Sequence, residues 1–378
     1  MTVGLLGATG YTGRLVATEL LRRKVACRLG GRDLDRLENL PVPGDIERTV
    51  VDVTDPTALD HFLAGIDAVI SCVGPFAALG LPVVEAAARS GVAYVDSTGE
   101  PAFMAEVYRR FGHAEDGSVS TPLVPACGFD YVPGDLAAAV AASDLGHQPV
   151  RQVLVAYQIS GLAPSRGTAR SALGAIAGVS LAPRVRQVPF PDGDRPAIEV
   201  PWGETLTIPR WLPSAEVVTC VTLAGTMGHL GSAAAGFGRS LGDSPAAAAG
   251  RRAVEVALRP ALGAAVAVSR RAAPLLSRLL DRMPEGPPEE RRAQTSFTVV
   301  AIARGESGRQ SAVACEGADI YGLTARLLVE AALRAGGAGA LTPAQALDPE
   351  PFLDAVSEGG AACGGPGSLT WRRFEPRS

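Results

Sequence analysis

Three glycines at positions 7, 10 and 13 have the spacing and the surroundings of a loop that binds the phosphates of a nucleotide. They follow a short apolar run, residues 3–6, and precede the helical pattern of residues 14–23. Glycines let a backbone turn tightly and approach a pyrophosphate, whose charge then lies on free amides at a helix N-terminus. Because a strand before the loop and a helix after it are the context that the motif requires, the sequence predicts a dinucleotide site.

Further residues of this site are expected at the ends of the third and fourth strands, because ligands of doubly wound sheets bind outside the carboxyl ends of the strands. Asp52 and Val53 end the third strand, where adenine would lie, and residues 72–76 end the fourth, near the pyrophosphate and the nicotinamide ribose. For Asp52, capping of the following helix is an equal alternative. The predicted cofactor-binding residues are Gly7, Thr9, Gly10, Tyr11, Thr12, Gly13, Arg32, Asp52, Val53, Cys72, Val73, Gly74, Pro75 and Phe76.

The end of the second strand favours NADP over NAD. An acid at this position binds the ribose 2′-hydroxyl of NAD, whereas an arginine accommodates the 2′-phosphate of NADP. Here the strand ends in Gly30 and Gly31, which leave room, and Arg32 then supplies a planar cationic group suited to phosphate. In the alternative interpretation, Asp33 caps the helix that follows and Arg32 is solvated.

Strand and helix patterns alternate in the first part of the chain, which indicates an α/β protein with a doubly wound parallel sheet. We expect this Rossmann domain at residues 1–130 and an inserted α/β (α+β) substrate domain at residues 131–315. The latter contains a β-like run at 152–159 and a stretch at 183–213 whose prolines favour edge strands or extended connections. The helices of residues 316–378 are expected to return to the Rossmann domain.

Composition excludes some classes of function. The net charge of −4 and the lack of a basic tract argue against nucleic-acid binding. Six cysteines, far apart and without a Cys-x-x-Cys pair, indicate reduced thiols and no metal site. The sequence starts with a strand pattern and has no apolar signal core, so a cytoplasmic location is expected. The helical pattern of residues 246–282 could lie on a membrane surface, but packing on the domain core is the favoured interpretation.

Seven short motifs follow one another along nearly the whole chain: residues 7–13, 73–76, 94–100, 127–133, 165–168, 286–292, and 324–325 with 342–344. In these motifs the chain resembles the bacterial saccharopine dehydrogenase-like family, which includes trans-acting enoyl reductases of polyketide and lipid assembly. The resemblance implies a Rossmann domain with NADP, an inserted α/β domain over the nicotinamide, and hydride transfer to an imine or an enoyl thioester.

Lys24, the only lysine of the chain, lies next to the second strand and away from the expected cleft. No tyrosine is followed by lysine four residues later, so the Tyr-x-x-x-Lys mechanism of short-chain dehydrogenases is excluded. A lysine Schiff base or a lysine general base is excluded as well. The presence of only one lysine also weighs against literal saccharopine chemistry, which in the lysine-pathway members of the family depends on several basic groups.

Enoyl reduction does not require a catalytic lysine, because the cofactor delivers a hydride to the β-carbon and the enolate oxygen needs only one or two hydrogen-bond donors. Tyr131 and Arg166 are the candidate catalytic donors, with Ser165 and Thr168 beside Arg166. A structural turn at Tyr131 and a surface ion pair at Arg166 are equal alternatives.

These observations predict an NADPH-dependent oxidoreductase, in the first place a trans-acting enoyl reductase of polyketide, lipid or natural-product biosynthesis. Its expected substrate is a small or apolar intermediate, linked to CoA or to a carrier such as an acyl carrier protein, and a homodimer is a further expectation. Two alternatives stay open. One is reduction of an amino-acid-derived imine, and the other is a non-redox cyclase, isomerase or partner protein with a structural nucleotide.

Overall fold

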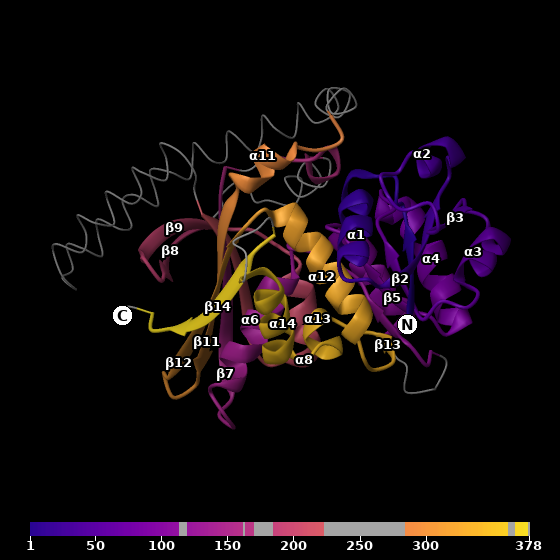
Figure 1. Ribbon diagram of the computed structural model, residues 1–378. Coiled ribbons are helices and arrows are strands. Elements are labelled where there is room, and N and C mark those ends of the chain that lie inside the picture. Colours follow the sequence, from indigo (N-terminus) through magenta and orange to yellow (C-terminus); the bar gives the residue numbers. More distant parts are fainter. Residues whose placement is uncertain (113–118, 162, 170–183, 223–283, 362–366, 377–378) are drawn as a thin grey trace, which may run out of the picture.

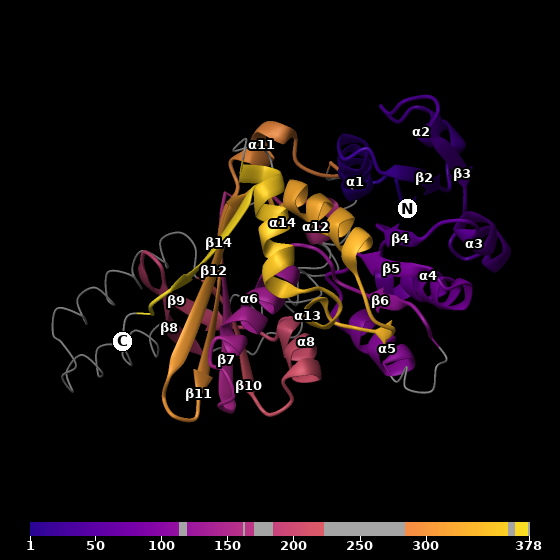
Figure 2. The same cartoon turned by 60° about the horizontal axis from the view of Figure 1, so that its bottom comes forward.

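The computed structural model describes residues 1–112, 119–161, 163–169, 184–222, 284–361 and 367–376. Within them the strands form two seven-stranded sheets, with helices packed around and between the sheets (Figure 1). The N-terminal sheet lies on one side of the molecule and the second sheet on the other, and the helix α12 (Ile320–Arg334) lies between them (Figure 2). The predicted helical pattern of residues 246–282 lies outside the described residues.

The N-terminal sheet is parallel throughout, in the order β13-β6-β5-β4-β1-β2-β3. The strand order reverses between β1 and β4, which is the topology of a Rossmann sheet and confirms the predicted fold class. A ligand is expected in the crevice at this reversal, outside the carboxyl ends of the strands. The strands are β1 (Thr2–Leu6), β2 (Ala26–Gly31), β3 (Glu47–Val50), β4 (Ala68–Ser71), β5 (Ala93–Asp96), β6 (Pro122–Val124) and β13 (Gly339–Ala340).

Local sequence signals set the ends of the helices that connect these strands. The carboxylate of Asp55 caps α3 by accepting hydrogen bonds from the amides of Thr57 and Ala58. α4 ends at Gly91, whose left-handed φ of 67° glycine adopts without strain. The connecting helices are α1 (Tyr11–Arg22), α2 (Leu34–Glu38), α3 (Pro56–Leu63), α4 (Phe76–Ser90) and α5 (Pro101–Phe111). α1 begins three residues before the helical pattern predicted at residues 14–23.

The second sheet is mixed, in the order β14-β12-β11-β7-β10-β9-β8. Neighbouring strands are antiparallel except β7 and β10, which are parallel. The alanine-rich helix α6 (Val132–Ser143) is buried along most of its length and packs on β7, β11 and β12. The strands are β7 (Val150–Ser160), β8 (Val185–Phe190), β9 (Gly193–Glu199), β10 (Glu216–Thr222), β11 (Ser296–Gly305), β12 (Gln310–Ala318) and β14 (Leu369–Phe374).

The proline-rich stretch forms the outer strands of the second sheet and one helix. β8 is an edge strand, as the prolines predict, because a proline cannot donate to a neighbouring strand. Where the prolines predict extended chain, the structure also has the helix α8 (Glu204–Trp211). Pro209 lies in its second half, and the helix is so short that the proline interrupts few backbone hydrogen bonds.

The C-terminal part of the chain contributes to both sheets. α12 packs on α1, β4 and β5, and β13 joins the edge of the first sheet beside β6. α14 (Pro349–Ala361), which follows the short α13 (Pro343–Ala346), packs on α6, and β14 pairs with β12 of the second sheet. The predicted return of residues 316–378 to the Rossmann domain is therefore wrong for α14 and β14. The predicted boundary at residue 315 also falls inside β12, because long-range strand pairing leaves no local signal.

Asp135 joins three helices of the second half of the molecule. Its buried carboxylate accepts hydrogen bonds from the Thr207 hydroxyl at 2.8 Å and the Trp211 indole Nε1 at 3.1 Å, both on α8. It also accepts the amide of Ala344, on α13, at 2.8 Å. Because the Thr207 hydroxyl is buried together with this carboxylate, it depends on Asp135 for a hydrogen-bond partner.

Replacing Asp135 by alanine should lower the free energy of unfolding by about 3 kcal/mol, since it leaves one buried and two partly buried donors without their partner. Urea denaturation of the purified protein measures this change. Asp45→Ala, at an exposed position, is the control and should change the free energy of unfolding by less than about 0.5 kcal/mol. A loss for Asp135→Ala no larger than that of the control would contradict the role of Asp135.

Candidate functional site

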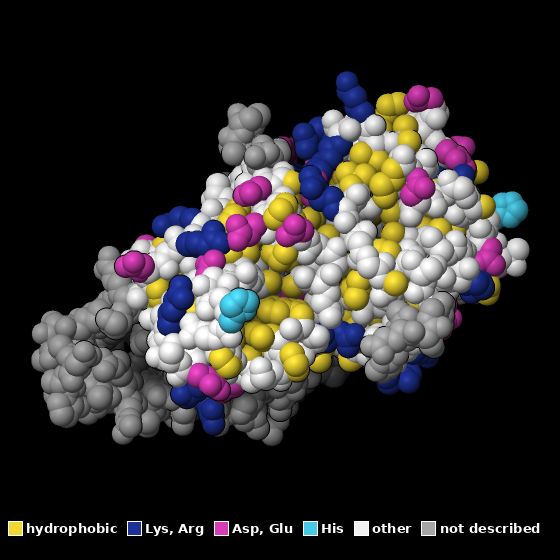
Figure 3. Space-filling view, turned by 90° about the horizontal axis from the view of Figure 1, so that it is seen from below, with side chains coloured by type: hydrophobic (Ala, Val, Ile, Leu, Met, Phe, Trp, Pro, Cys, Tyr) yellow, Lys and Arg dark blue, Asp and Glu magenta, His cyan; other side chains and the backbone are white. Residues whose placement is uncertain are grey.

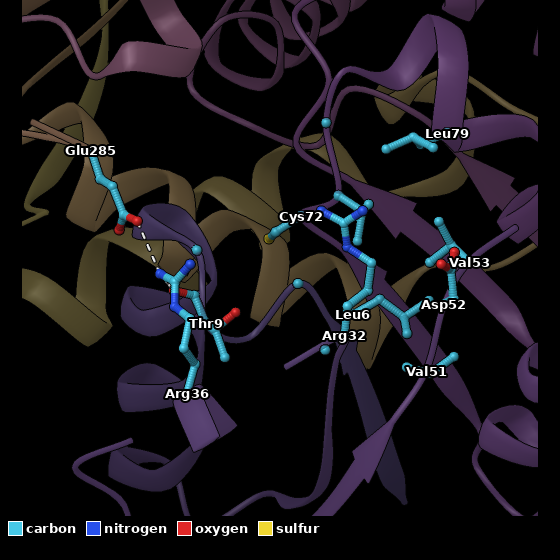
Figure 4. Close-up of a pocket in the computed structure, with 15 residues that line it drawn as sticks. Leu6, Thr9, Arg32, Arg36, Val51, Asp52, Val53, Cys72, Leu79 and Glu285 are labelled. Atoms are coloured by element: carbon cyan, nitrogen blue, oxygen red, sulfur yellow. Dashed lines mark hydrogen bonds and ion pairs between the residues drawn. The ribbon is translucent and has the colours of Figure 1, made fainter. Parts of the chain in front are cut away.

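A pocket lies at the carboxyl ends of β1, β2 and β4, where the strand order of the first sheet reverses. Arg36 and Glu285 lie on one side of it and Asp52 on the other, and the side chain of Arg32 extends between them (Figure 4). The position agrees with the rule that open α/β sheets bind ligands at this reversal. The residues that line the pocket are Leu6, Gly7, Thr9, Gly10, Gly31, Arg32, Arg36, Val51, Asp52, Val53, Cys72, Val73, Gly74, Leu79 and Glu285.

The glycine loop is fixed by backbone contacts. The amides of Gly7 and Ala8 donate to the carbonyl oxygen of Gly30 at 3.0 and 3.1 Å. Gly7 has a left-handed φ of 79°, and a side chain there would also press on the backbone of Cys72. Gly10 is the N-cap of α1 and has no side chain to bond the first amides of the helix. These amides are thus available to an anion, and the positive end of the helix dipole favours one.

Most of the predicted cofactor residues line this pocket, and the others lie beside it. The residues outside it are Tyr11, Thr12, Gly13, Pro75 and Phe76. A Cβ atom at Gly13 would overlap the carbonyl oxygen of Gly7, so Gly13 serves the close packing of helix on loop. Pro75 is the exposed N-cap of α4, and Thr12 lies in the first turn of α1.

The two aromatic residues of the prediction face neighbouring segments. The Tyr11 hydroxyl donates to the carbonyl oxygen of Pro287 at 2.7 Å, and its ring meets that of Tyr321 edge-on, with centroids 5.3 Å apart. Phe76 is buried and packs on the ring of Phe103, with centroids 5.6 Å apart. Both rings bury apolar surface against another segment, and the sequence around them gives no sign of that packing.

Hydrogen bonds bear on the alternatives that the sequence left open at Asp33 and Asp52, since Asp33 is the cap of α2 whereas Asp55, and not Asp52, is the cap of α3. The Asp33 carboxylate caps α2 by accepting the amide of Arg36 at 3.0 Å, whereas Arg32 lines the pocket. Asp52 lines the pocket too, and its carboxylate accepts the amide and the hydroxyl of Thr54 at 2.9 and 2.8 Å. These hydrogen bonds, together with nearby Arg32, lower the pKa of Asp52. Asp52 is therefore an anion at the edge of the pocket.

Sequence reasoning missed several lining residues. Leu6, Gly31 and Val51 adjoin predicted residues at strand ends, so the strand pattern could have found them. Arg36 follows Arg32 by four residues, so a search of the neighbouring sequence for a second cationic side chain could have found it. Glu285 is 249 residues away from Arg36 in the chain, and no local pattern indicates its position. The further missed residue is Leu79.

The candidate catalytic residues occupy different surroundings. Tyr131 is 2% exposed, does not line the pocket, and packs so closely on Gly203 that a Cβ atom there would overlap its ring. Its prediction as a donor to substrate is thus not supported, and the structural alternative accounts for its position. Arg166 lies beside the pocket, since its amide donates to the carbonyl oxygen of Glu285 at 3.1 Å. The amide of the neighbouring Ser165 donates to the hydroxyl of Tyr321 at 2.6 Å.

A buried acid, Glu204, lies next to Gly203 at the start of α8. The hydroxyl of Tyr157 contacts both the Glu204 carboxyl group and the carbonyl oxygen of Asp130, the latter at 2.9 Å. A hydroxyl has one proton and can donate to only one of them. A protonated Glu204 satisfies both contacts, because it donates to Tyr157 and Tyr157 donates to Asp130. Burial raises the pKa of Glu204 to about 8, which agrees with this arrangement.

The raised pKa of Glu204 makes stability depend on pH. In the unfolded chain its pKa is near 4.5, so the folded state holds the proton more tightly. This contribution is fully present below about pH 4.5 and is lost as the pH rises through about 8. The free energy of unfolding should therefore fall between about pH 5 and pH 9, by an amount on the order of a few kcal/mol.

Urea denaturation at a series of pH values measures this dependence. In Glu204→Gln the fall should be much smaller, whereas Glu38→Gln, at an exposed position on α2, should keep it. Equal slopes for the wild type and Glu204→Gln would show that Glu204 is ionised in the folded protein at neutral pH.

The surroundings of the pocket bear on other kinds of chemistry. Lys24 is exposed in the turn between α1 and β2, at the opposite end of α1 from the pocket. The described residues contain no cluster of three or more His, Cys, Asp or Glu side chains that could hold a metal ion. Among them, none of the helices has the length and apolar character that crossing a bilayer requires. The face in Figure 3 carries both acidic and basic side chains.

Comparisons with known proteins agree on the cofactor domain. Residues 7–103 match the family model described as NAD(P)H-binding. A probable mitochondrial saccharopine dehydrogenase-like oxidoreductase of Arabidopsis thaliana is 31% identical over 243 residues, which are 57% of this chain and 53% of the relative. A trans-acting enoyl reductase of Mycobacterium leprae is 36% identical over 139 residues, which are 35% of this chain and 33% of that protein. The chain thus matches about half of the plant relative and a third of the mycobacterial one.

The fold has a solved counterpart along the whole chain. Apo saccharopine dehydrogenase (L-Glu forming) from Saccharomyces cerevisiae matches with a TM-score of 0.60, covering 99% of this chain and 100% of the yeast chain. At 14% sequence identity this likeness concerns the fold alone. Together with the sequence relatives, it confirms that the chain is similar to the saccharopine dehydrogenase-like proteins and that its N-terminal part is an NAD(P)H-binding Rossmann domain.

Proposed function

We propose that the protein is an NADPH-dependent oxidoreductase that reduces the C=C bond of an enoyl thioester. The expected substrate is an apolar intermediate of polyketide, lipid or natural-product biosynthesis, linked to CoA or to a carrier protein. The observation that carries the proposal is the pocket beside the glycine loop, because it combines free helix amides with arginines at the end of β2.

The charges around the end of β2 support NADPH as the cofactor. Arg32 and Arg36 both line the pocket there. Asp33 is the acid next to them, and its carboxylate is engaged in capping α2, so it is not free to receive a ribose 2′-hydroxyl. Two guanidinium groups without a competing ribose-binding acid fit a 2′-phosphate, for which arginine has the right planar donor geometry.

Each part of NADPH would have its own partners in the pocket. The amides at the start of α1 would hold the pyrophosphate. Arg32 and Arg36 would hold the 2′-phosphate. Asp52 and Val53 would border the adenine. Residues 72–74 would line the path toward the nicotinamide. When bound, NADPH supplies the hydride for the reduction. The residues of the chain would fix its orientation, which lowers the entropic part of the barrier.

Two observations favour an enoyl thioester over other acceptors. The mycobacterial relatives, 34% to 36% identical over 139 residues, are named trans-acting enoyl reductases. In addition, the only lysine, Lys24, is exposed and lies outside the pocket. Reduction of an enoyl thioester needs no ionised lysine, since a hydride adds to the β-carbon, the electron pair moves to the thioester oxygen, and the α-carbon then takes a proton.

Binding of nucleotides tests the cofactor. Titration followed by nicotinamide fluorescence should give a lower Kd for NADPH than for NADH. Arg32→Ala should weaken NADPH binding about 10-fold or more through the lost charged hydrogen bonds, and affect NADH less. Gly10→Glu should abolish binding of both, because it places a carboxylate at the phosphate loop. Arg109→Ala, exposed on α5, is the matched control. Folded protein that binds neither nucleotide would overturn the proposal.

Turnover tests the reaction. Purified protein with NADPH and 2-enoyl thioesters of increasing chain length should consume NADPH, seen as loss of nicotinamide absorbance, and yield the saturated thioester by mass spectrometry. The activity should rise with chain length if the substrate is apolar, and Arg109→Ala should retain it. Saturated acyl thioesters serve as the control without an acceptor bond. Turnover of an amino-acid-derived imine, and none of the enoyl thioesters, would refute the assignment of the substrate.

A further inference from the structure

An acidic side chain, Glu285, lies inside the pocket that is proposed to bind phosphate groups. One carboxylate oxygen is 2.9 Å from a guanidinium nitrogen of Arg14. The other is 2.9 Å from a guanidinium nitrogen of Arg36 (Figure 4). Both arginines also donate to the carbonyl oxygen of Thr9, at 2.7 and 3.1 Å. Glu285 thus engages one nitrogen of the Arg36 guanidinium group, in the pocket where an anionic ligand would bind.

The backbone around Glu285 is held on both sides. Its carbonyl oxygen accepts the amide of Arg166 at 3.1 Å. The carbonyl oxygen of Pro287 accepts the hydroxyl of Tyr11, and Gly286 packs so closely on the Tyr11 ring that a Cβ atom there would overlap it. These contacts anchor the main chain beside α1, so the side chain of Glu285 can turn away from the arginines without a shift of the main chain.

The carboxylate is charged in this setting. Partial burial raises its pKa, but hydrogen bonds from Arg14 and Arg36 outweigh that effect, and the net pKa lies below the ordinary glutamate value. The ion pairs are partly exposed, with 38% of the Glu285 side chain and 50% of the Arg36 side chain accessible. Solvent and salt therefore weaken them, and an ion of higher charge can replace the carboxylate.

We propose that Glu285 is a specificity-determining residue that competes with the 2′-phosphate of NADPH for Arg36. The competition limits the preference for NADPH over NADH, because only NADPH needs Arg36 free. The inference rests on the proposed cofactor, and it predicts that binding of NADPH turns the Glu285 side chain away while its main chain stays in place. A carboxylate that acted through its charge alone would also disfavour NADPH more than NADH, because of the extra phosphate, but by the same factor with and without Arg36.

The experiment measures Kd for NADPH and NADH by calorimetry, on the full chain, for the wild type and four variants. Glu285→Gln keeps the shape and removes the charge, and it should lower Kd for NADPH about 3-fold to 30-fold and that for NADH less than about 2-fold. In the background of Arg36→Ala, the same substitution should no longer change the ratio of the two Kd values, because the contested group is gone. Glu38→Gln removes a charge from an exposed position on α2 and is the matched control.

Each outcome decides the inference. An unchanged ratio of the two Kd values in Glu285→Gln, or an equal change with and without Arg36, would overturn it. The thermal unfolding midpoint of each variant identifies any loss of folded protein. Failure of the proposed function is seen separately: if the wild type binds NADPH but reduces no enoyl thioester, the reaction is wrong and the binding test of Glu285 still stands. If the wild type binds neither nucleotide, both the cofactor and the role of Glu285 are refuted.

Discussion

The close approach of α1 to the glycine loop is the constraint on which the rest of the site depends. The carbonyl oxygen of Gly7 lies where a side chain at position 13 would begin, and the backbone of Cys72 lies where one at position 7 would. The loop is also bonded to Gly30, so β1, β2 and β4 meet around one small space. Backbone packing therefore defines the shape of the pocket, and Arg32, Arg36 and Glu285 set its charge.

The helix α12 transmits this constraint to the second half of the molecule. Arg23, near the end of α1, pairs with Glu330 on α12 and with Glu19 on its own helix. Both carboxylates are largely buried, so the pairs specify the position of α12 more than they add to stability. At the other end of α12, Tyr321 meets Tyr11 and accepts the amide of Ser165. The segment of residues 285–288 is thereby held beside the phosphate loop.

The parts of the structure that local signals determine could be predicted from the sequence. β1 and α1 follow the strand and the helix predicted around the glycine loop, and Gly7 and Gly10 line the pocket where the motif indicates. Residues whose roles arise from distant packing could not be predicted. Tyr131 belongs to one of the motifs but is buried against Gly203, and the place of β14 depends on its pairing with β12 and its packing on α14. Glu285 reaches the pocket through contacts that span most of the chain, and sequence periodicity carries no information about such contacts.

Residues 339–340 form the strand β13 at the edge of the first sheet, and β14 pairs with β12 in the second. During synthesis on the ribosome, the edge of β6 thus remains unpaired until nearly the whole chain has emerged. The glycine loop is synthesised first, Glu285 of the pocket much later, and the sheet of the nucleotide-binding half is completed last. An exposed strand edge of this kind attracts other chains, so the delay makes the nascent protein depend on rapid closure by its own distant residues.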